Sequence, residues 1–248
     1  MSASYQEAAA LFKPWPRAIL FDAGFTLTFQ DGARIAAYAA QAGLTLDPHA
    51  LERAERALRA ELREKEGVIL RTHADKPDGW LTAVFRKLLV LAEVQASDDL
   101  LDRAAAAILE RHLAVNAWSR VGAGVRESLA RLRENGLRLG VVSNSEGTVE
   151  AMLIETGLRD LFDVVVDSAV VGVSKPDPRI FHLALEHLGI AASDAVMVGD
   201  SPSADIGGAE AAGVRAALLD PYDFYPWSRA PRFEDVAALT EALLASRI

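Results

Sequence analysis

The sequence predicts an α/β protein whose central sheet is parallel and doubly wound and which carries an inserted helical region. One observation is the short apolar run Ala18–Phe21, which ends in the carboxylate Asp22 and is too tightly bounded for a helix. A second is the alternation of strand and helix patterns after Gly122, which is typical of βαβ units. A third is the stretch 30–115, which carries four helical patterns and no convincing strand.

The inserted region is expected to form four helices, and the later part of the chain is expected to alternate between helices and strands. The expected inserted helices are 31–41, 47–67, 81–94 and 97–113. Asp47 is the N-cap of the second helix and Gly67 its expected end. The expected later strands are 138–142, 163–166, 195–198 and 214–219. The helices between them are expected at 125–135, 148–156, 179–188 and up to Ala212, each followed by a glycine, and a last helix ends the chain.

These patterns predict two domains. Residues 1–29 and 118–248 are expected to form the α/β core, and residues 30–117 a helical cap domain over the carboxyl edge of the sheet. Two loops have roles that the sequence leaves open. The loop 71–80 is either a substrate-selecting loop or an exposed connector, and it contains Arg71, His73, Lys76 and Trp80. The aromatic loop Tyr222–Trp227 is expected to pack within the chain, to line the pocket or to form a dimer contact.

The composition limits the partners of this chain. Its 248 residues carry a net charge of −9, which argues against a general nucleic-acid or anionic-membrane binder, because both need a basic surface. The absence of cysteine excludes disulfides, thiolate metal sites and a cysteine nucleophile. No signal peptide and no membrane-spanning segment is visible in the sequence. We expect a cytoplasmic monomer or homodimer that binds a small molecule.

Residues whose side chains could take part in catalysis or binding follow the predicted strands, at the edge where open α/β sheets bind their ligands. Asp22 follows the first strand, Ser143 the second, Lys175 lies in the loop after the third, and Asp200 and Asp205 follow the fourth. Taken singly, each has an ordinary role as a helix cap, a turn former or a solvated loop residue. Because they occur in order at strand ends, we expect them to meet in one crevice.

Phosphoryl transfer is the chemistry that these groups share. A carboxylate such as Asp22 can attack phosphorus and form an aspartyl-phosphate, which divides one displacement into two easier ones. Oxygen ligands from Asp22, Asp200 and a backbone carbonyl suit Mg²⁺. Lys175 can neutralise the phosphate and the nucleophile. Ser143, the N–H groups that follow it and Thr26 can bind the transferring oxygens. The acidic net charge does not exclude a small phosphorylated ligand, because a local pocket can be positive on an acidic protein.

Four segments of the core form a series of motifs. They are Phe21-Asp22-Ala-Gly-Phe-Thr26-Leu27, Val141-Val-Ser143-Asn144, Ser174-Lys175-Pro176-Asp177-Pro178 and the segment from Val198-Gly199-Asp200 through Asp205 to Gly213. This series resembles the haloacid dehalogenase (HAD) superfamily, in the subgroup with a helical cap after the first motif. The resemblance covers roughly residues 18–219 and implies a Rossmann-like core, Mg²⁺ and phosphatase activity on a small metabolite.

The resemblance implies a role for each matched residue. By that match, the catalytic residues would be Asp22, the nucleophile, and Lys175. The residues that would bind phosphate are Thr26, Ser143, Asn144 and Lys175. The metal ligands would be Asp22, Asp200 and the backbone carbonyl of Gly24. Asp205 would be either a further ligand or a residue that holds a ligand in place.

Gly24 departs from the family pattern. In the family's phosphatases, the residue two positions after the nucleophile is an aspartate that protonates the leaving group and then activates water. Glycine supplies no proton, and general acid–base help is typically worth ~10²–10⁴ in rate. Glu146 is the nearest replacement acid by sequence, although a first-turn glutamate also simply favours the helix dipole.

Several alternatives to an ordinary phosphatase therefore stay open. The chain could be a catalytically weak or inactive member that binds a phosphorylated ligand or a protein partner. It could be a phosphonatase-like C–P hydrolase, which would need a cap lysine such as Lys65, Lys76 or Lys87. A metal-free dehalogenase is disfavoured, because the chain keeps both Asp200 and Asp205.

Overall fold

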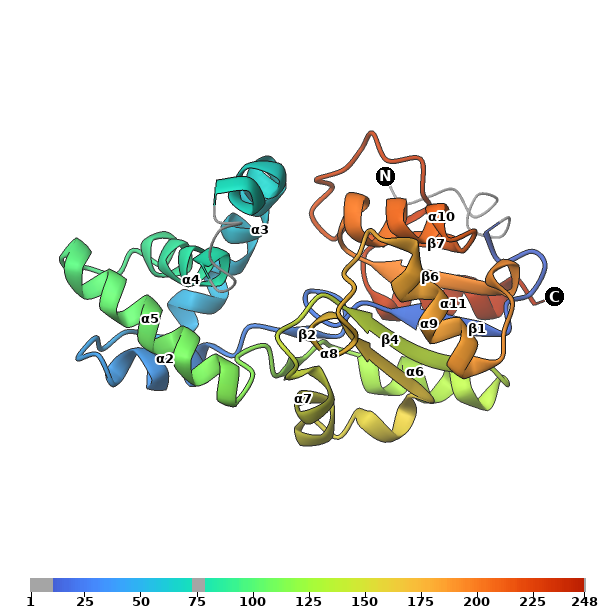
Figure 1. The fold of residues 1–248 in the computed structure, drawn as a ribbon, viewed down its shortest axis with the longest axis horizontal. Helices are drawn as coiled ribbons and strands as arrows, with labels where there is room; N and C mark the ends of the chain where they lie inside the picture. Colours follow the sequence, from blue (N-terminus) through green and yellow to red (C-terminus); the bar gives the residue numbers. More distant parts are fainter. Residues whose placement is uncertain (1–10, 73–78, 248) are drawn as a thin grey trace. The chain divides into compact units, whose positions relative to one another are not determined.

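The chain folds as two compact units in the computed structural model, which describes residues 11–72 and 79–247 (Figure 1). The core unit is formed by the segments up to Phe29 and from Arg120 onward, and the helical unit by Gln30–Ser119. The sheet belongs to the core unit, and the helical unit is built from helices joined by short connections.

A six-stranded parallel sheet forms the centre of the core unit, in the order β5-β4-β1-β6-β7-β8. Its strands are β1 (Ala18–Phe21), β4 (Arg138–Ser143), β5 (Val164–Asp167), β6 (Ala195–Gly199), β7 (Arg215–Leu219) and β8 (Arg232–Phe233). The chain winds from β1 through β4 to β5 and then crosses to β6 on the other side of β1. The predicted doubly wound parallel sheet is confirmed. The carboxyl ends of β4, β1 and β6 lie side by side where the winding reverses, which is the usual ligand position in such sheets.

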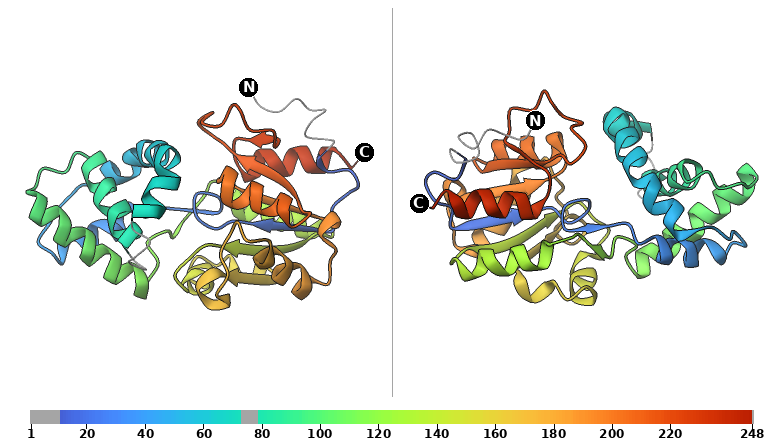
Figure 2. Two further views of the ribbon diagram at one scale, coloured as in Figure 1. Left: turned by 45° about the horizontal axis from the view of Figure 1, so that its top comes forward. Right: turned by 180° about the vertical axis from the view of Figure 1, so that it is seen from behind.

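Helices cover both faces of this sheet (Figure 2). One face carries α6 (Val125–Glu134), α7 (Val149–Glu155) and α11 (Val236–Ala245), and the other carries α9 (Pro178–Leu188) and α10 (Gly208–Ala211). Along β1, Ile19 and Phe21 join the apolar core on the first face, while Ala18 and Leu20 join the core on the second. Because both faces of β1 are buried, its sequence is a continuous apolar run rather than an alternating one.

The helical unit consists of α2 (Gly32–Ala40), α3 (Pro48–Thr72), α4 (Gly79–Leu91) and α5 (Asp98–Ala114). Asp31 begins α2 by accepting a hydrogen bond from the backbone N–H of Arg34 at 2.9 Å. The expectation that the second helix ends at Gly67 is wrong, since α3 continues to Thr72. A single glycine inside a helix costs only about 1 kcal/mol, which neighbouring turns can offset. No helix within the described ranges is long and apolar enough to cross a membrane.

Several short elements were not expected from the sequence. They are β2 (Thr28–Phe29), β3 (Arg120–Val121), β8, α8 (Ser168–Val171), the 3₁₀ turns η1 (Arg159–Leu161) and η2 (Ala192–Asp194), and the π-helical turn η3 (Pro202–Gly207). Elements of two to six residues are too short for a hydrophobic period to be recognised. The most consequential is η3, because the helix expected after Asp200 begins with this wider turn and continues as α10.

Candidate active site

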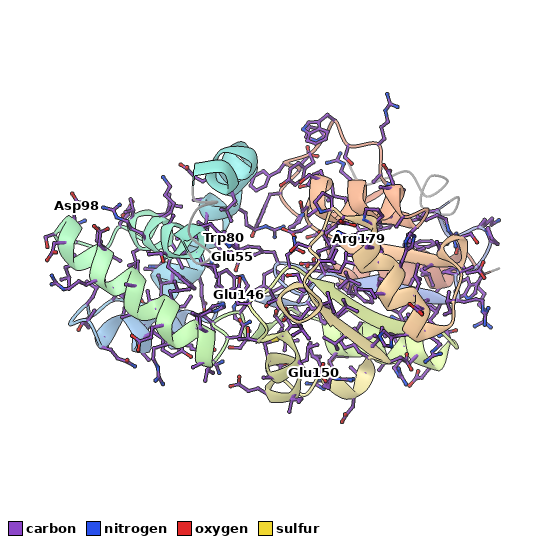
Figure 3. The ribbon with its side chains drawn as sticks, viewed as in Figure 1. Glu55, Trp80, Asp98, Glu146, Glu150 and Arg179 are labelled. Carbon is purple, nitrogen blue, oxygen red and sulfur yellow. The ribbon has the colours of Figure 1, made fainter. Side chains whose placement is uncertain are left out.

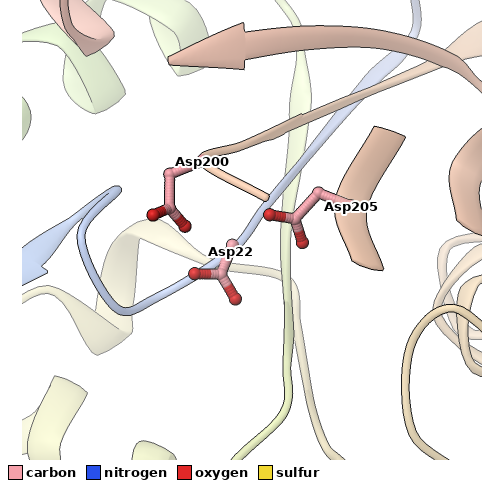
Figure 4. A group of neighbouring side chains, drawn as sticks. All are labelled: Asp22, Asp200 and Asp205. Atoms are coloured by element: carbon pink, nitrogen blue, oxygen red, sulfur yellow. The ribbon is translucent and has the colours of Figure 1, made fainter. Parts of the chain in front are cut away.

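Three aspartates converge at the carboxyl edge of the sheet (Figure 4). Asp22 follows β1, Asp200 follows β6, and Asp205 lies in η3. One carboxylate oxygen from each residue lies within 4.8 Å of those of the other two. The backbone N–H of Asp22 donates to the carbonyl of Val198 at 2.9 Å, which extends the β1–β6 pairing by one residue. This extension fixes the position of Asp22 beside the strand that leads to Asp200.

Lys175 joins two of these aspartates through a buried ion network. Its Nζ atom lies 2.6 Å from Oδ1 of Asp22 and 2.6 Å from Oδ1 of Asp205. The side chains of Lys175 and Asp205 are each 2% exposed, and that of Asp22 is 12% exposed. Buried charges need such partners, because removing an isolated ion from water costs several kcal/mol. Asp22, Lys175 and Asp205, which are far apart in the sequence, therefore meet at one point.

Burial sets the protonation behaviour of this network. It raises the pKa of Asp22 to about 6, with Lys175 opposing the shift and the like charge of Asp205 adding to it. Burial also acts to lower the pKa of Lys175, but the charges of Asp205 and Asp22 outweigh it, so that this pKa is raised. Lys175 is therefore a permanent cation at physiological pH, while Asp22 changes its charge in mildly acidic solution.

Both carboxylate oxygens of Asp205 have partners. Oδ1 accepts from Lys175, and Oδ2 accepts from the backbone N–H of Ser201 at 2.9 Å. Ser201 also begins η3, because its Oγ accepts from the backbone N–H of Ala204 at 3.1 Å. Gly199, the last residue of β6, leaves the space that the Asp205 carboxylate occupies: a Cβ there would lie 2.2 Å from Oδ2. Glycine and serine at the end of the strand thus determine where Asp205 sits.

The donor set of this edge fits a hard divalent cation. One oxygen atom from each of the three carboxylates lies within 4.8 Å of the other two, and Mg²⁺ prefers oxygen ligands. Asp200 is half-buried, whereas Asp205 is almost fully enclosed. Gly24 lies in the turn after β1, where it forms a bridge with Thr28. Its carbonyl remains the predicted additional oxygen ligand.

Thr26 contributes a buried hydroxyl to the turn after β1. Its side chain is 2% exposed, and its Oγ1 has no hydrogen-bond partner within residues 11–72 and 79–247. A buried polar group without a partner costs about 1–3 kcal/mol, so this hydroxyl is suited to donate a hydrogen bond to an oxygen atom of a bound ligand. The preceding residue, Phe25, has a left-handed backbone with φ 54°, a conformation that glycine adopts more readily.

The loop after β4 connects Ser143 to the lysine. Ser143 is buried, and its Cα pairs with that of Asp167 in β5. The amide of Asn144 is bonded at both ends to the backbone of Lys175: Nδ2 donates to its carbonyl at 2.9 Å, and Oδ1 accepts from its N–H at 2.8 Å. Ser143 and Asn144 therefore lie at the predicted edge, but the Asn144 side chain contacts the lysine loop.

Asp167 and Ser168 hold this loop in place, and neither is among the residues that the sequence predicts for the site. The Asp167 carboxylate accepts hydrogen bonds from the N–H groups of Gly147, Val149 and Ala169 at 3.1, 3.3 and 3.0 Å. The Ser168 hydroxyl accepts from the N–H of Ser145 at 3.1 Å. Asp167 directly follows a predicted strand, so the pattern that identified Asp22 could also have identified it.

The remaining candidate residues belong to other elements of the chain or lie outside the described residues. Glu146 is half-buried on the loop between β4 and α7 (Figure 3). Among the candidate imine-forming lysines, Lys87 pairs with Glu61 at 3.1 Å within the helical unit. Trp80 is half-buried in α4. The residues whose side chains lie outside the described part are Lys65, Arg71, His73 and Lys76.

The aromatic loop has an inward and an outward part. Tyr225 is buried in the apolar core of α9 and α10, and Trp227 packs edge-on against it with ring centroids 5.8 Å apart. Trp227 nevertheless stays 68% exposed. The Asp220 carboxylate, at the end of β7, accepts from the N–H groups of Phe224 and Tyr225 and from Arg232, which fixes the shape of the loop. Packing within the chain thus accounts for Tyr225.

The fold and the site together define a doubly wound α/β protein with an acidic, lysine-bearing site where the winding reverses. The sequence model of the haloacid dehalogenase-like hydrolases matches residues 16–213. The chain belongs to this family of hydrolases.

Known proteins of the family are similar to this chain over different extents. The phosphoserine phosphatase of Thermus thermophilus is 43% identical over 93 residues, and this match spans 37% of each chain. The HAD phosphatase of Thermococcus onnurineus is 26% identical, with a TM-score of 0.60 over 94% of this chain and 100% of that one. The 2-haloacid dehalogenase of Pseudomonas syringae pv. Tomato is 27% identical, with a TM-score of 0.57 over 93% of this chain and 99% of that one.

Proposed function

We propose that this protein is a Mg²⁺-dependent phosphatase of small phosphorylated metabolites, with Asp22 as the nucleophile. The observation that carries the proposal is the network in which Lys175 bridges Asp22 and Asp205 at 2.6 Å, with Asp200 beside them. A carboxylate held against a buried cation, among oxygen donors suited to Mg²⁺, is what attack on a phosphate dianion requires. The family and the phosphatases similar to this chain support the same reaction.

The proposed first step is attack by a carboxylate oxygen of Asp22 on phosphorus. A bond forms between this oxygen and phosphorus, the bond from phosphorus to the leaving oxygen breaks, and the leaving group departs as an anion that keeps the bonding electron pair. The ammonium of Lys175 offsets the negative charge that gathers around the nucleophile. The hydroxyls of Thr26 and Ser143 are the proposed donors to the phosphoryl oxygens. Water then hydrolyses the aspartyl-phosphate, which releases phosphate and restores Asp22.

The residues proposed to hold the metal are Asp22, Asp200 and the carbonyl of Gly24, with Asp205 supporting them through Lys175 and Ser201. When bound, Mg²⁺ supplies charge neutralisation for the phosphate dianion. Because Gly24 cannot donate a proton, we infer that the substrate carries a good leaving group, such as an acyl phosphate.

A second candidate function follows from the same glycine. Without an acid at position 24, the site would still suit a phosphate dianion. The Lys175 ammonium, the Thr26 hydroxyl and the carboxylates proposed to hold Mg²⁺ do not depend on that acid. The protein would then bind a phosphorylated ligand and turn it over slowly or not at all. The two functions differ in whether Asp22 becomes phosphorylated.

The discriminating experiment measures phosphate release from a panel of acyl phosphates and phosphomonoesters with Mg²⁺ or with EDTA. We expect turnover of at least one acyl phosphate by the wild type with Mg²⁺, and none by Asp22→Asn. Intact mass spectrometry of acid-quenched reactions should show a phosphate adduct on the wild type alone. Activity that survives in Asp22→Asn would disprove the assignment of the nucleophile. Binding of phosphate without any turnover would favour the second function.

A further inference from the structure

We propose that Asn144 is a positioning residue whose side chain holds the backbone of Lys175 so that the ammonium reaches Asp22 and Asp205. The sequence motif suggested instead that Asn144 binds phosphate directly. The consequence for catalysis rests on the proposed function, whereas the placement of Lys175 does not depend on it.

Lys175 needs an external support for its backbone. It lies in the loop between α8 and α9, outside any strand or helix. Its Nζ must nevertheless meet two carboxylates at 2.6 Å each, in a site where its side chain is 2% exposed. A long, flexible side chain can keep two short contacts only if its own backbone is fixed, because each freely rotating bond widens the range of Nζ positions.

Asn144 supplies this support with both ends of its amide. Oδ1 accepts from the N–H of Lys175 at 2.8 Å, and Nδ2 donates to its carbonyl at 2.9 Å. The pair satisfies both backbone polar groups of one residue, as a neighbouring strand would. Asparagine carries a donor and an acceptor on one short planar group, whereas an ionised aspartate only accepts. The chemistry of the contact therefore selects asparagine.

Asn144 is itself anchored to the end of β5. The next residue, Ser145, exchanges hydrogen bonds with the Ser168 hydroxyl: its N–H donates at 3.1 Å and its carbonyl accepts at 3.2 Å. Two residues further on, the N–H of Gly147 donates to Asp167 at 3.1 Å. Asp167 and Ser168 thus hold the loop after β4 by hydrogen bonds, and the Asn144 side chain in this loop holds the backbone of Lys175. The position of the lysine is therefore tied to residues at the ends of β4 and β5.

Competitive acetylation of the full-length protein tests this placement without requiring activity. Trace acetic anhydride followed by mass spectrometry compares labelling of Lys175 with that of the exposed Lys13 in the same molecule. In the wild type, Lys175 should be strongly protected. Asn144→Ala removes both hydrogen bonds to the Lys175 backbone and should raise the relative labelling of Lys175 by about tenfold. Asn144→Asp keeps the acceptor but turns a second acceptor oxygen toward the Lys175 carbonyl, so it should also raise the relative labelling of Lys175.

Asn135→Ala is the matched control. Asn135 also donates from Nδ2 to a backbone carbonyl, that of Arg131 at 2.8 Å, but it lies at the end of α6. We expect wild-type protection of Lys175 in this variant. Wild-type protection in both Asn144→Ala and Asn144→Asp would overturn the proposal. If Asn144→Ala does not fold, the labelling of Asn144→Asp decides, because its side chain has nearly the same shape.

Turnover adds a separate readout. If the proposed function holds, both Asn144 variants should lower kcat, and a phosphate-ligand role would instead appear as a raised KM with Lys175 still protected. If the wild type turns over no substrate, the proposed function fails, while the labelling result still decides whether Asn144 positions Lys175.

Discussion

A Cβ atom on Gly199 would lie 2.2 Å from Oδ2 of Asp205. The Asp205 carboxylate therefore fills the space beside the end of β6 that a side chain at position 199 would need. The same oxygen accepts the N–H of Ser201 at 2.9 Å, and the other oxygen of Asp205 accepts from Lys175. The absence of a side chain at position 199 is therefore a condition for the ion network.

Gly199→Ala is predicted to displace Asp205. Overpacking of a buried site typically costs about 1–3 kcal/mol, and here the neighbouring atom belongs to a charged group that cannot leave its partner freely. We expect this loss in urea unfolding, together with weakened Mg²⁺ binding in calorimetry. Gly207→Ala is the control, since its Cβ would meet only the carbonyl of Pro202 at 3.5 Å. Equal stability and equal Mg²⁺ affinity in the two variants would contradict the prediction.

Lys175→Met is predicted to leave two buried carboxylates without their cation. Breaking a buried ion pair on one side typically costs about 3–5 kcal/mol. We expect this loss at pH 7.5 in urea unfolding and a smaller loss near pH 5, where Asp22 is protonated and needs the cation less. Lys87→Met should change the stability by at most about 1 kcal/mol, because Lys87 forms a partly exposed pair with Glu61. A loss in Lys175→Met that does not depend on pH would argue against the network.

Mg²⁺ affinity is predicted to fall below pH 6. Burial raises the pKa of Asp22 from 3.8 to about 6, and Asp22 must be deprotonated to act as the proposed metal ligand. Affinity measured by calorimetry should be constant above pH 7 and should decrease by about tenfold per pH unit well below pH 6. The stability of the metal-free protein should change in the opposite sense, because the contribution of a protonated Asp22 is lost as the pH rises through 6. The break near pH 6 should vanish in Asp22→Asn.

Gly24→Asp is predicted to reduce the dependence of the rate on the leaving group. A positioned acid is typically worth ~10²–10⁴ in rate, and it helps most where the leaving oxygen is strongly basic. The wild type should therefore hydrolyse acyl phosphates much faster than alkyl phosphates. Gly24→Asp should hydrolyse alkyl phosphates faster than the wild type does, so that the rates for the two substrate types become more similar. The backbone of this turn is left-handed at Phe25, not at position 24, so an aspartate should be accommodated without that strain. Equal rates for both substrate types in the wild type would show that another group supplies the proton.

Periodicity and motif spacing alone were sufficient to predict the type of sheet and the edge at which the candidate site lies. Buried parallel strands require continuous apolar runs, so Ala18–Phe21 was recognisable as a strand and coincides with β1. Since the carboxyl ends of parallel strands share one edge, a polar residue after each run sufficed to bring Asp22, Asp200 and Asp205 together. The motif around Lys175 indicated a cation at the same edge, and the structure places its Nζ between two of these carboxylates.

How these groups are held depends on contacts that no sequence pattern reveals. The raised pKa of Asp22 results from burial by residues distant in the sequence, which no local pattern encodes. The contact of Asn144 with the backbone of Lys175 spans 31 residues, and the space left at Gly199 for Asp205 depends on the wide turn of η3. Residue types and periodicity specify which side chains are available at an edge. Distances, enclosure and hydrogen-bond partners arise only when separate strands are brought side by side.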